Sequence, residues 1–173
     1  MYPFFRITKM LVFGRFKQKL KVTDKSILKM CVWPGDIDVF FEMNNGRHLT
    51  MMDFGRFDLA ARSGLLKTVK ENSWGLVVAG SSVRYRHRLK LFQNYELHSE
   101  VIGHDDKWIY FHQKTIRKGR IHSAALIRTA VTSENGIVKV EEVMKAVGHL
   151  REIPMLPQWV KAWAEADQLR PWE

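Results

Sequence analysis

Residues 44–64 show the clearest hydrophobic pattern of the chain, because their apolar side chains spread around nearly the whole circumference of a predicted helix. Asn44 and Asn45 stand where this helix would begin, and Asn is a preferred N-cap residue. Gly64 is a natural stop signal at the other end. Since a helix that is apolar nearly all round is buried, we predict one long central helix enclosed by the rest of the fold.

Strand-like patterns precede and follow this helix. One strand is predicted within residues 23–33, and a polar connection over residues 67–73 leads from the helix to four more. These four are residues 76–91, 95–103, 108–116 and 121–133. Short polar turns of the kind that joins antiparallel neighbours separate them. Because the strands do not alternate with helices, we predict an α+β fold in which an antiparallel sheet of about five strands wraps around the central helix.

Both ends of the chain extend beyond this predicted domain, which spans residues 23–150. Residues 1–22 form a basic amphipathic arm, and residues 151–173 form a proline-bounded segment with a C-terminal helix. The longest apolar run of the arm is five residues, whereas a membrane span needs about 20. It also lacks the features of a signal peptide. We therefore expect the arm either to pack on the domain as a short helix or to lie on an anionic membrane surface.

The charge and cysteine content of the 173 residues narrow the function classes. The formal net charge is +10, but residues 1–30 hold eight of the basic residues against a single acid, Asp24. The basicity therefore belongs to the arm, and we predict no nucleic-acid partner. A single cysteine, Cys31, excludes an internal disulfide and suits a reducing compartment. We expect a cytoplasmic protein, with the arm as its route to a membrane.

The loop in front of the central helix carries candidate chemistry. Asp36 and Asp38 lie a few residues ahead of the helix N-terminus. Free backbone N–H groups at such a terminus are oriented donors for a developing negative charge, and a nearby acid can supply the attack. Asp38 could equally be a turn residue whose side chain bonds to the backbone. The spacing alone leaves both interpretations open.

Several other chemistries lack their motifs. The chain has no GxSxG elbow, P-loop or GxGxxG fingerprint. Four histidines on predicted strands and turns show no metal-ligand spacing. These are His98, His104, His112 and His122. We therefore predict neither a metal nor a cofactor.

Residues 32–66 carry the runs DID, MNN, GRHL, DFGR and RSGLL, and in these they resemble the 4-hydroxybenzoyl-CoA type of acyl-CoA thioesterases of the hotdog superfamily. The branch is the one similar to thioesterase superfamily member six. The later runs VAGSSVRYRHRL, GHDDKWIYF and LPQWVKAW extend the resemblance over most of residues 25–165. It implies a hotdog fold, a homodimer or a tetramer of dimers, and active sites at the subunit interface.

The resemblance also implies residue roles in thioester hydrolysis. Asp38 would be the nucleophile or general base, and backbone N–H groups around Asn45 and Gly46 would stabilise the oxyanion. The Asn45 side chain could orient water or the thioester. The substrate would be a fatty or aryl acyl thioester of CoA or acyl-carrier protein, which places the chain in lipid metabolism. CoA would be part of the substrate and not a cofactor.

Two positions depart from the pattern of these relatives. Glu42 stands where many have His, and His48 where many have an aromatic residue. Glu42 adds negative charge near Asp38, which would raise the pKa of an acid by repulsion and so tune a base or spoil a nucleophile. His48 could contact substrate, or face solvent or an interface. We keep Glu42 and His48 as candidate substrate-binding residues.

Cations at alternate positions of one predicted strand could bind the phosphates of CoA. They are Arg84, Arg86, Arg88 and Lys90. The same pattern fits the solvated outer face of a sheet. Arg84 and Arg86, together with Lys107 in a later turn, are the candidate phosphate contacts.

A second function class remains open. Glu42 and the basic arm favour a non-catalytic acyl- or lipid-binding hotdog protein at the membrane surface. The retained Asp38 and Asn45 favour the enzyme.

Overall fold

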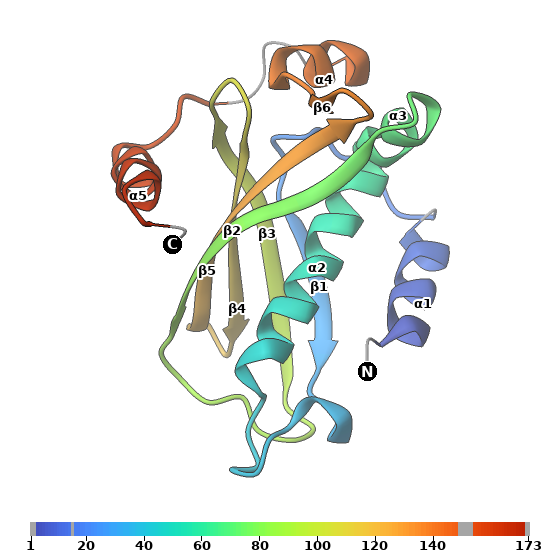
Figure 1. Ribbon diagram of the computed structural model, residues 1–173. Coiled ribbons are helices and arrows are strands. Elements are labelled where there is room, and N and C mark those ends of the chain that lie inside the picture. The colour runs from blue at the N-terminus through green and yellow to red at the C-terminus, as the bar shows by residue number, and fades with distance from the viewer. Residues whose placement is uncertain (1–2, 15, 149–153, 172–173) are drawn as a thin grey trace.

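The long helix α2 (Asn45–Arg62) runs along the inner face of one curled antiparallel sheet (Figure 1). The structure is a computed structural model that describes residues 3–14, 16–148 and 154–171. The strands are β1 (Ser26–Cys31), β2 (Gly75–Tyr85), β3 (Asn94–His104), β4 (Ile109–Arg117), β5 (Arg120–Ser133) and the short β6 (Gly136–Ile137). The other helices are α1 (Phe4–Gly14), the 3-10 helix η1 (Pro34–Asp36), α3 (Leu65–Glu71), α4 (Val140–Val147) and α5 (Gln158–Gln168).

The sheet has the strand order β1-β3-β4-β5-β2, with β6 paired to β5, and every pairing is antiparallel. The α+β fold with a sheet wrapped around one central helix is confirmed. The β4–β5 turn is the expected tight hairpin, because Lys118 and Gly119 both have positive φ (49° and 73°), as a type I′ turn requires.

Three details of the prediction are wrong. Residues 67–73 are not a plain connection, because Leu65 and Val69 lie one helical turn apart and bury the inner side of α3. The strand predicted over residues 76–91 ends at Tyr85, where the N–H groups of Arg86 and His87 both donate to the His122 carbonyl.

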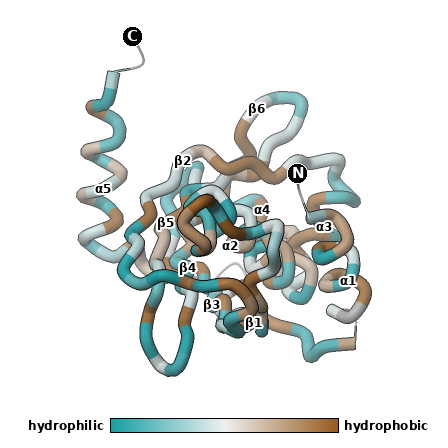
Figure 2. Tube along the Cα trace, turned by 90° about the horizontal axis from the view of Figure 1, so that it is seen from below, coloured by the Kyte–Doolittle hydropathy of each residue, from teal (hydrophilic) through white to brown (hydrophobic). Residues whose placement is uncertain are grey.

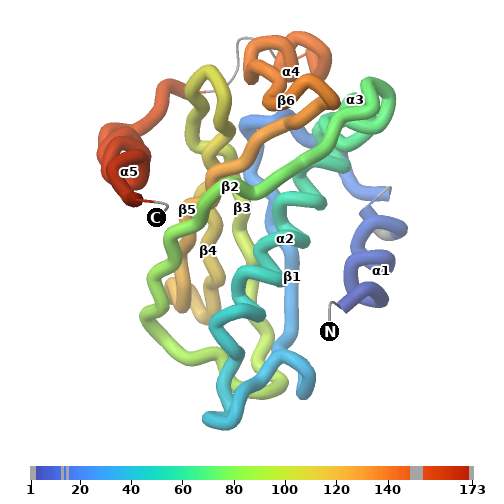
Figure 3. The backbone as a smooth tube through the Cα atoms, in the orientation of Figure 1, coloured from blue at the N-terminus to red at the C-terminus, as the bar shows by residue number. Residues whose placement is uncertain are grey.

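The third error concerns the link between β2 and β3, which is not a hairpin. β2 pairs with β5 at one edge of the sheet, whereas β3 lies beside β1 near the other edge. Residues 86–93 therefore cross the lower end of the sheet (Figure 3). A short polar turn and a short crossing link have the same local composition, so the sequence could not separate them.

A buried polar network attaches α2 to the sheet. Gln113 on β4 is fully enclosed, and its Nε2 donates to Ser99 Oγ at 2.6 Å and to the Met52 carbonyl at 2.8 Å. Its Oε1 accepts from Arg56 Nη1 at 2.6 Å. Gly55 lies directly over this network, and a Cβ there would overlap Ser99 Oγ. The absence of a side chain at Gly55 therefore sets how closely α2 approaches β3 and β4.

The terminal helices α1 and α5 lie on opposite sides of the molecule (Figure 2). α1 packs beside α2, with Ile7 and Met10 against the core, while Phe4 and Phe5 remain exposed. α5 covers the outer face of the sheet, where its buried Val160 meets a separate apolar cluster that includes Tyr110. In the described residues no helix is both long and apolar enough to cross a bilayer.

The side chain of Arg128 on β5 secures α5. Its guanidinium pairs with Asp167 at 2.8 Å and lies 5.1 and 5.2 Å from the ring centres of Trp108 and Trp163. These contacts combine a charge pair with two cation–π interactions.

We predict that Gly55→Ala destabilises the fold. Helix propensity alone favours Ala by about 1 kcal/mol. Overpacking a filled core costs about 1–3 kcal/mol, and the overlapped Ser99 hydroxyl is held in place by Gln113. We expect a net loss of up to about 2 kcal/mol in unfolding by urea. The reverse exchange at the exposed Ala61, Ala61→Gly, is the control and should cost about 1 kcal/mol. A Gly55→Ala protein more stable than the original would contradict this packing.

Candidate active site

Asp36 anchors the loop between β1 and α2. It is 2% exposed, and its Oδ2 accepts from Arg6 Nη1 at 2.6 Å and from the Trp33 N–H at 3.0 Å. Arg47 Nε lies 3.7 Å from Oδ1 of the same carboxylate. The Asp36 carbonyl also accepts from the Asn44 N–H at 2.9 Å. Asp36 is therefore a buried ionic anchor and has no free oxygen to offer to a substrate.

Asp38 lies in a tight turn at the outer end of this loop. Its Oδ1 accepts from the Phe40 N–H at 2.8 Å, and its own N–H donates to the Glu42 carbonyl at 2.9 Å. Phe41 closes the turn with a φ of 57°. Within the described ranges, no protein group donates to the Asp38 Oδ2 atom. Asp38 is thus a turn residue whose second carboxylate oxygen is left open by the described residues, and the two interpretations of this acid are compatible.

The N-terminus of α2 provides one open backbone donor. Asn44 is the N-cap, and its Oδ1 accepts from the Gly46 N–H at 2.9 Å. The N–H groups of Arg47 and His48 donate to the Asn44 carbonyl. The Asn45 N–H has no acceptor in the part of the chain that the structure describes. Of the two predicted oxyanion donors, Gly46 is engaged by the cap and Asn45 is open.

The crossing link between β2 and β3 brings positive charge to the same loop. Glu42 pairs with Lys90 in an isolated antiparallel bridge, and its Oε2 lies 2.8 Å from Arg88 Nε. The Glu42 charge is therefore partly neutralised, which reduces the expected repulsion with Asp38.

The end of β2 meets the start of α2 at Tyr85. Its hydroxyl donates to the Asn45 carbonyl at 3.1 Å, so its exposed neighbours Arg84 and Arg86 belong to the same end of the molecule. Lys107 lies in the β3–β4 turn, at the far end of the 11-residue β3. At roughly 3.3 Å per residue, the two ends of β3 lie roughly 30 Å apart. Lys107 is therefore far from Arg84 and Arg86 within one chain.

His48 points into the fold. It is 4% exposed, and its Nδ1 lies 3.0 Å from Ser123 Oγ, which in turn lies 2.8 Å from Thr115 Oγ1. Its ring meets the Tyr85 ring edge-on at a centroid distance of 5.2 Å. Burial, together with a smaller effect of the neighbouring His122, lowers the pKa of His48 to about 4. His48 is therefore a neutral group between α2 and the sheet at physiological pH.

Sequence reasoning missed two features of this site. Tyr85, whose hydroxyl binds the first turn of α2, is the first, and only its place among the cations could have suggested a site residue. Three consecutive apolar residues, Val39, Phe40 and Phe41, are also 84%, 74% and 72% exposed between Asp38 and Glu42. The sequence did contain a signal for them, namely a run of three apolar residues inside an acidic loop. Apolar side chains are normally buried, and an exposed group of them marks a contact surface.

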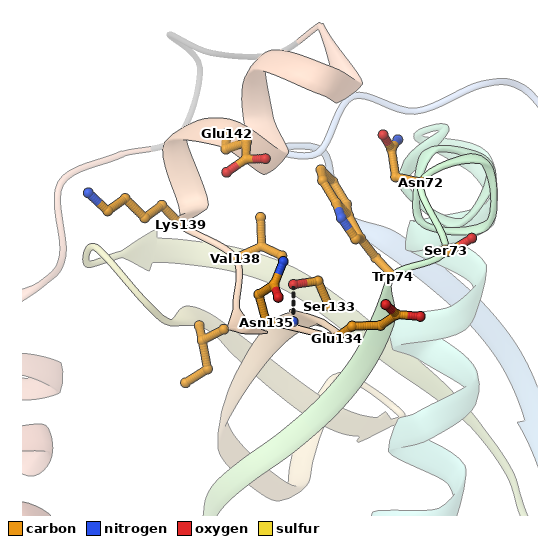
Figure 4. Close-up of a pocket in the computed structure, with 10 residues that line it drawn as sticks. Asn72, Ser73, Trp74, Ser133, Glu134, Asn135, Val138, Lys139 and Glu142 are labelled. Carbon is orange, nitrogen blue, oxygen red and sulfur yellow. Dashed lines mark hydrogen bonds between the residues drawn. The ribbon is translucent and has the colours of Figure 1, made fainter.

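A polar pocket of about 730 Å³ lies at the opposite end of the molecule, between the start of β2 and the β5–β6 turn (Figure 4). Trp74, Lys139 and Glu142 are among its lining residues, and a hydrogen bond from the Asn135 N–H to Ser133 Oγ shapes the turn. It contains none of the sequence-predicted site residues. In the residues placed by the structure, no cluster of three or more His, Cys, Asp or Glu side chains could hold a metal ion.

Comparisons with known proteins agree with this architecture. The YbaW probable thioesterase from Escherichia coli is 19% identical, with a TM-score of 0.66 over 72% of this chain and 97% of that chain. The hypothetical protein SAV2348 from Staphylococcus aureus, solved in complex with CoA, is 12% identical, with a TM-score of 0.66 over 83% of this chain and 96% of that chain. The sheet curled around α2 is thus a hotdog fold, as expected.

Sequence similarity identifies the family of the chain as well as its fold. Residues 32–164 match the Thioesterase-like superfamily, and the chain belongs to that family. The protein THEM6 of Drosophila melanogaster is 34% identical over 157 residues, which cover 89% of this chain and 79% of that protein.

We predict that His48 contributes to loss of stability in acid. Because its pKa is about 4 in the fold and near 6.5 in the unfolded chain, the unfolded chain binds the proton first. Stability is therefore intact above about pH 6.5 and falls as the pH decreases towards 4, by about 3 kcal/mol in total for this group.

The test compares urea unfolding of the wild type and His48→Gln between pH 7 and 4.5. The variant should show a shallower dependence on pH, whatever its stability at pH 7. All other titratable groups are the same in both proteins, so the difference reports on His48 and its coupling to His122. Parallel curves would show that His48 is not enclosed as described.

Proposed function

We propose that this protein hydrolyses acyl-CoA thioesters, with Asp38 as base or nucleophile and the Asn45 N–H as oxyanion donor. The observation that carries the proposal is the open carboxylate oxygen of Asp38 in the same loop that leads into α2 and its open Asn45 N–H. As a base, Asp38 accepts a proton from water, whose oxygen adds to the thioester carbonyl. The Asn45 N–H stabilises the resulting oxyanion. The C–S bond then breaks, and the CoA sulfur leaves and takes up the proton.

The CoA phosphates are bound by Arg84 and Arg86 in this proposal. Both side chains are exposed beside Tyr85, which contacts the first residue of α2. Guanidinium groups are suited to phosphate because they donate in a fixed fork. The CoA complex of the structurally similar Staphylococcus aureus protein supports a CoA ligand on this fold.

A homodimer completes the site in this proposal. β2 lies at the edge of the sheet, and its Leu76, Val77 and Val78 are 38%, 41% and 53% exposed. An apolar unpaired edge is a template for another strand. Antiparallel pairing of two β2 strands reverses the second copy, which would bring its β3–β4 turn, with Lys107, towards the first copy's active-site end.

One observation favours the second candidate, a lipid-binding protein at a membrane surface. Phe4, Phe5 and Phe16 of the N-terminal arm are 69%, 81% and 86% exposed among its lysines. Aromatic side chains with neighbouring cations suit the interface of an anionic bilayer. The arm can provide this contact for a cytoplasmic enzyme as well, so activity decides between the two functions.

We predict that Asp38→Asn folds normally but loses turnover. The amide oxygen of Asn can still accept from the Phe40 N–H, whereas the variant has no basic or nucleophilic carboxylate. We expect kcat to fall roughly 10²–10⁴-fold, with an unchanged melting temperature. The exposed Asp106 provides the matched control, since Asp106→Asn should keep full activity.

The assay uses short, medium and long acyl-CoAs and detects the released thiol. Full activity of Asp38→Asn would refute the assignment of the acid. A wild-type protein that hydrolyses none of these substrates would instead favour the lipid-binding function.

We predict that Val78→Lys weakens the dimer at least tenfold. A lysine on an edge strand opposes pairing because its charge would be buried against the second copy. Val12 on α1 is 48% exposed, so Val12→Lys is a matched control that should remain dimeric. Sedimentation velocity over a range of concentrations measures the equilibrium. A monomeric wild type would exclude the proposed assembly.

A further inference from the structure

A groove of about 1400 Å³ lies between α1 and the edge strand β1. Figure 1 shows α1 and β1 on the side of α2 away from β2. Among the described residues β1 pairs with β3 alone, so its other edge borders the groove. Apolar side chains of α1, β1 and α2 line its wall, among them Met10, Leu28 and Met30. The groove does not include Asp38 or Asn45. It adjoins the candidate active-site loop through Asp36 and Arg47 but does not contain the proposed catalytic groups.

Positive charge surrounds this apolar wall. The lining residues include seven Lys and Arg side chains but only two acids. One of the acids, Asp36, already pairs with Arg6, and the other, Glu96, pairs with His98. Lys9 is exposed on α1 and lies one helical turn beyond Arg6, on the side of the helix that borders the groove. The groove therefore combines apolar walls with an excess of cations.

The floor of the groove contains a buried hydroxyl whose proton has no acceptor. Tyr95 is 3% exposed and lies beside the Arg6 guanidinium, which can only donate, and its O–H finds no acceptor among residues 3–14, 16–148 and 154–171. Burial raises the pKa of Tyr95, so the hydroxyl keeps its proton at physiological pH. A buried donor without an acceptor is unfavourable, and native structures rarely keep one without a reason. An acceptor atom of a ligand would remove this cost.

We propose that the groove binds a single-chain amphiphile with an anionic head group. The acyl chain lies along Met10, Leu28 and Met30, the head group accepts from the Tyr95 hydroxyl, and Lys9 neutralises its charge. Each part of the ligand thus meets the matching part of the groove. A fatty-acid carboxylate and a lysophospholipid phosphate share this chemistry.

The test measures binding of oleate and of oleoyl lysophosphatidate by calorimetry, with monoolein as the uncharged comparison. We expect both anions to bind at least tenfold more tightly than monoolein. Whichever of oleate and oleoyl lysophosphatidate binds more tightly identifies the preferred head group. Lys9→Glu should weaken binding about tenfold, whereas Lys161→Glu on the exposed side of α5 should not. Equal affinities for the two variants, or for monoolein, would overturn the proposal.

Two further measurements locate the ligand. Cys31 is the single cysteine of the chain and lines the groove, so bound oleate should slow its reaction with a thiol reagent. Tyr95→Phe should weaken oleate binding three- to tenfold while raising the melting temperature of the ligand-free protein, since the variant has no buried hydroxyl whose proton lacks an acceptor. Asp38→Asn should bind oleate like the wild type, which separates this groove from the active site. Unaltered Cys31 reactivity in saturating oleate would place the ligand elsewhere.

Discussion

The buried carboxylate of Asp36 is the interaction on which the active-site end depends. It joins Arg6 of α1, Arg47 of α2 and the backbone of the loop, and it lies two residues before Asp38. Loss of one partner from a buried ion pair costs about 3–5 kcal/mol, because the remaining charge stays enclosed without compensation. Asp36 therefore anchors the base of the loop, where its carbonyl accepts from the Asn44 N–H at the start of α2. An anchor of this kind would serve the preorganisation that the catalysis proposed for Asp38 requires.

Two different kinds of contact complete this end of the molecule. The first is local, since Asn44 caps α2 and its engagement of the Gly46 N–H leaves the Asn45 N–H as the open donor. The second is distant, since the link between β2 and β3 passes the loop and pairs Arg88 with Glu42. Glu42 departs from the family pattern, and the neighbouring guanidinium offsets part of the negative charge that it adds to this loop.

Features of the fold and the site could be predicted from the sequence where they depend on residues close together in the chain, and not where they depend on distant ones. The bounds of α2 followed from Asn44 and Gly64, and the hotdog fold followed from the strand pattern and the resemblance, because these signals are local or extended along the chain. The place of β2 at the sheet edge could not be read, since no local residue distinguishes a hairpin from a crossing link. Nor could the burial of His48, because its partner Ser123 lies 75 residues away. Roles assigned to Asp38 and Asn45 remain predictions.

The N-terminal arm shows why its two expected roles do not exclude each other. A helix has two sides, and in α1 one side packs against α2 through Ile7 and Met10 while Phe4 and Phe5 point away from the core. Arg6 ties the packed side to Asp36, so the exposed aromatic residues are held at the active-site end rather than on a free tether. Any surface that the aromatic residues contact is therefore kept close to Asp38 and to the groove under α1. Packing of the arm thus sets the orientation in which the protein would meet a membrane or a lipid.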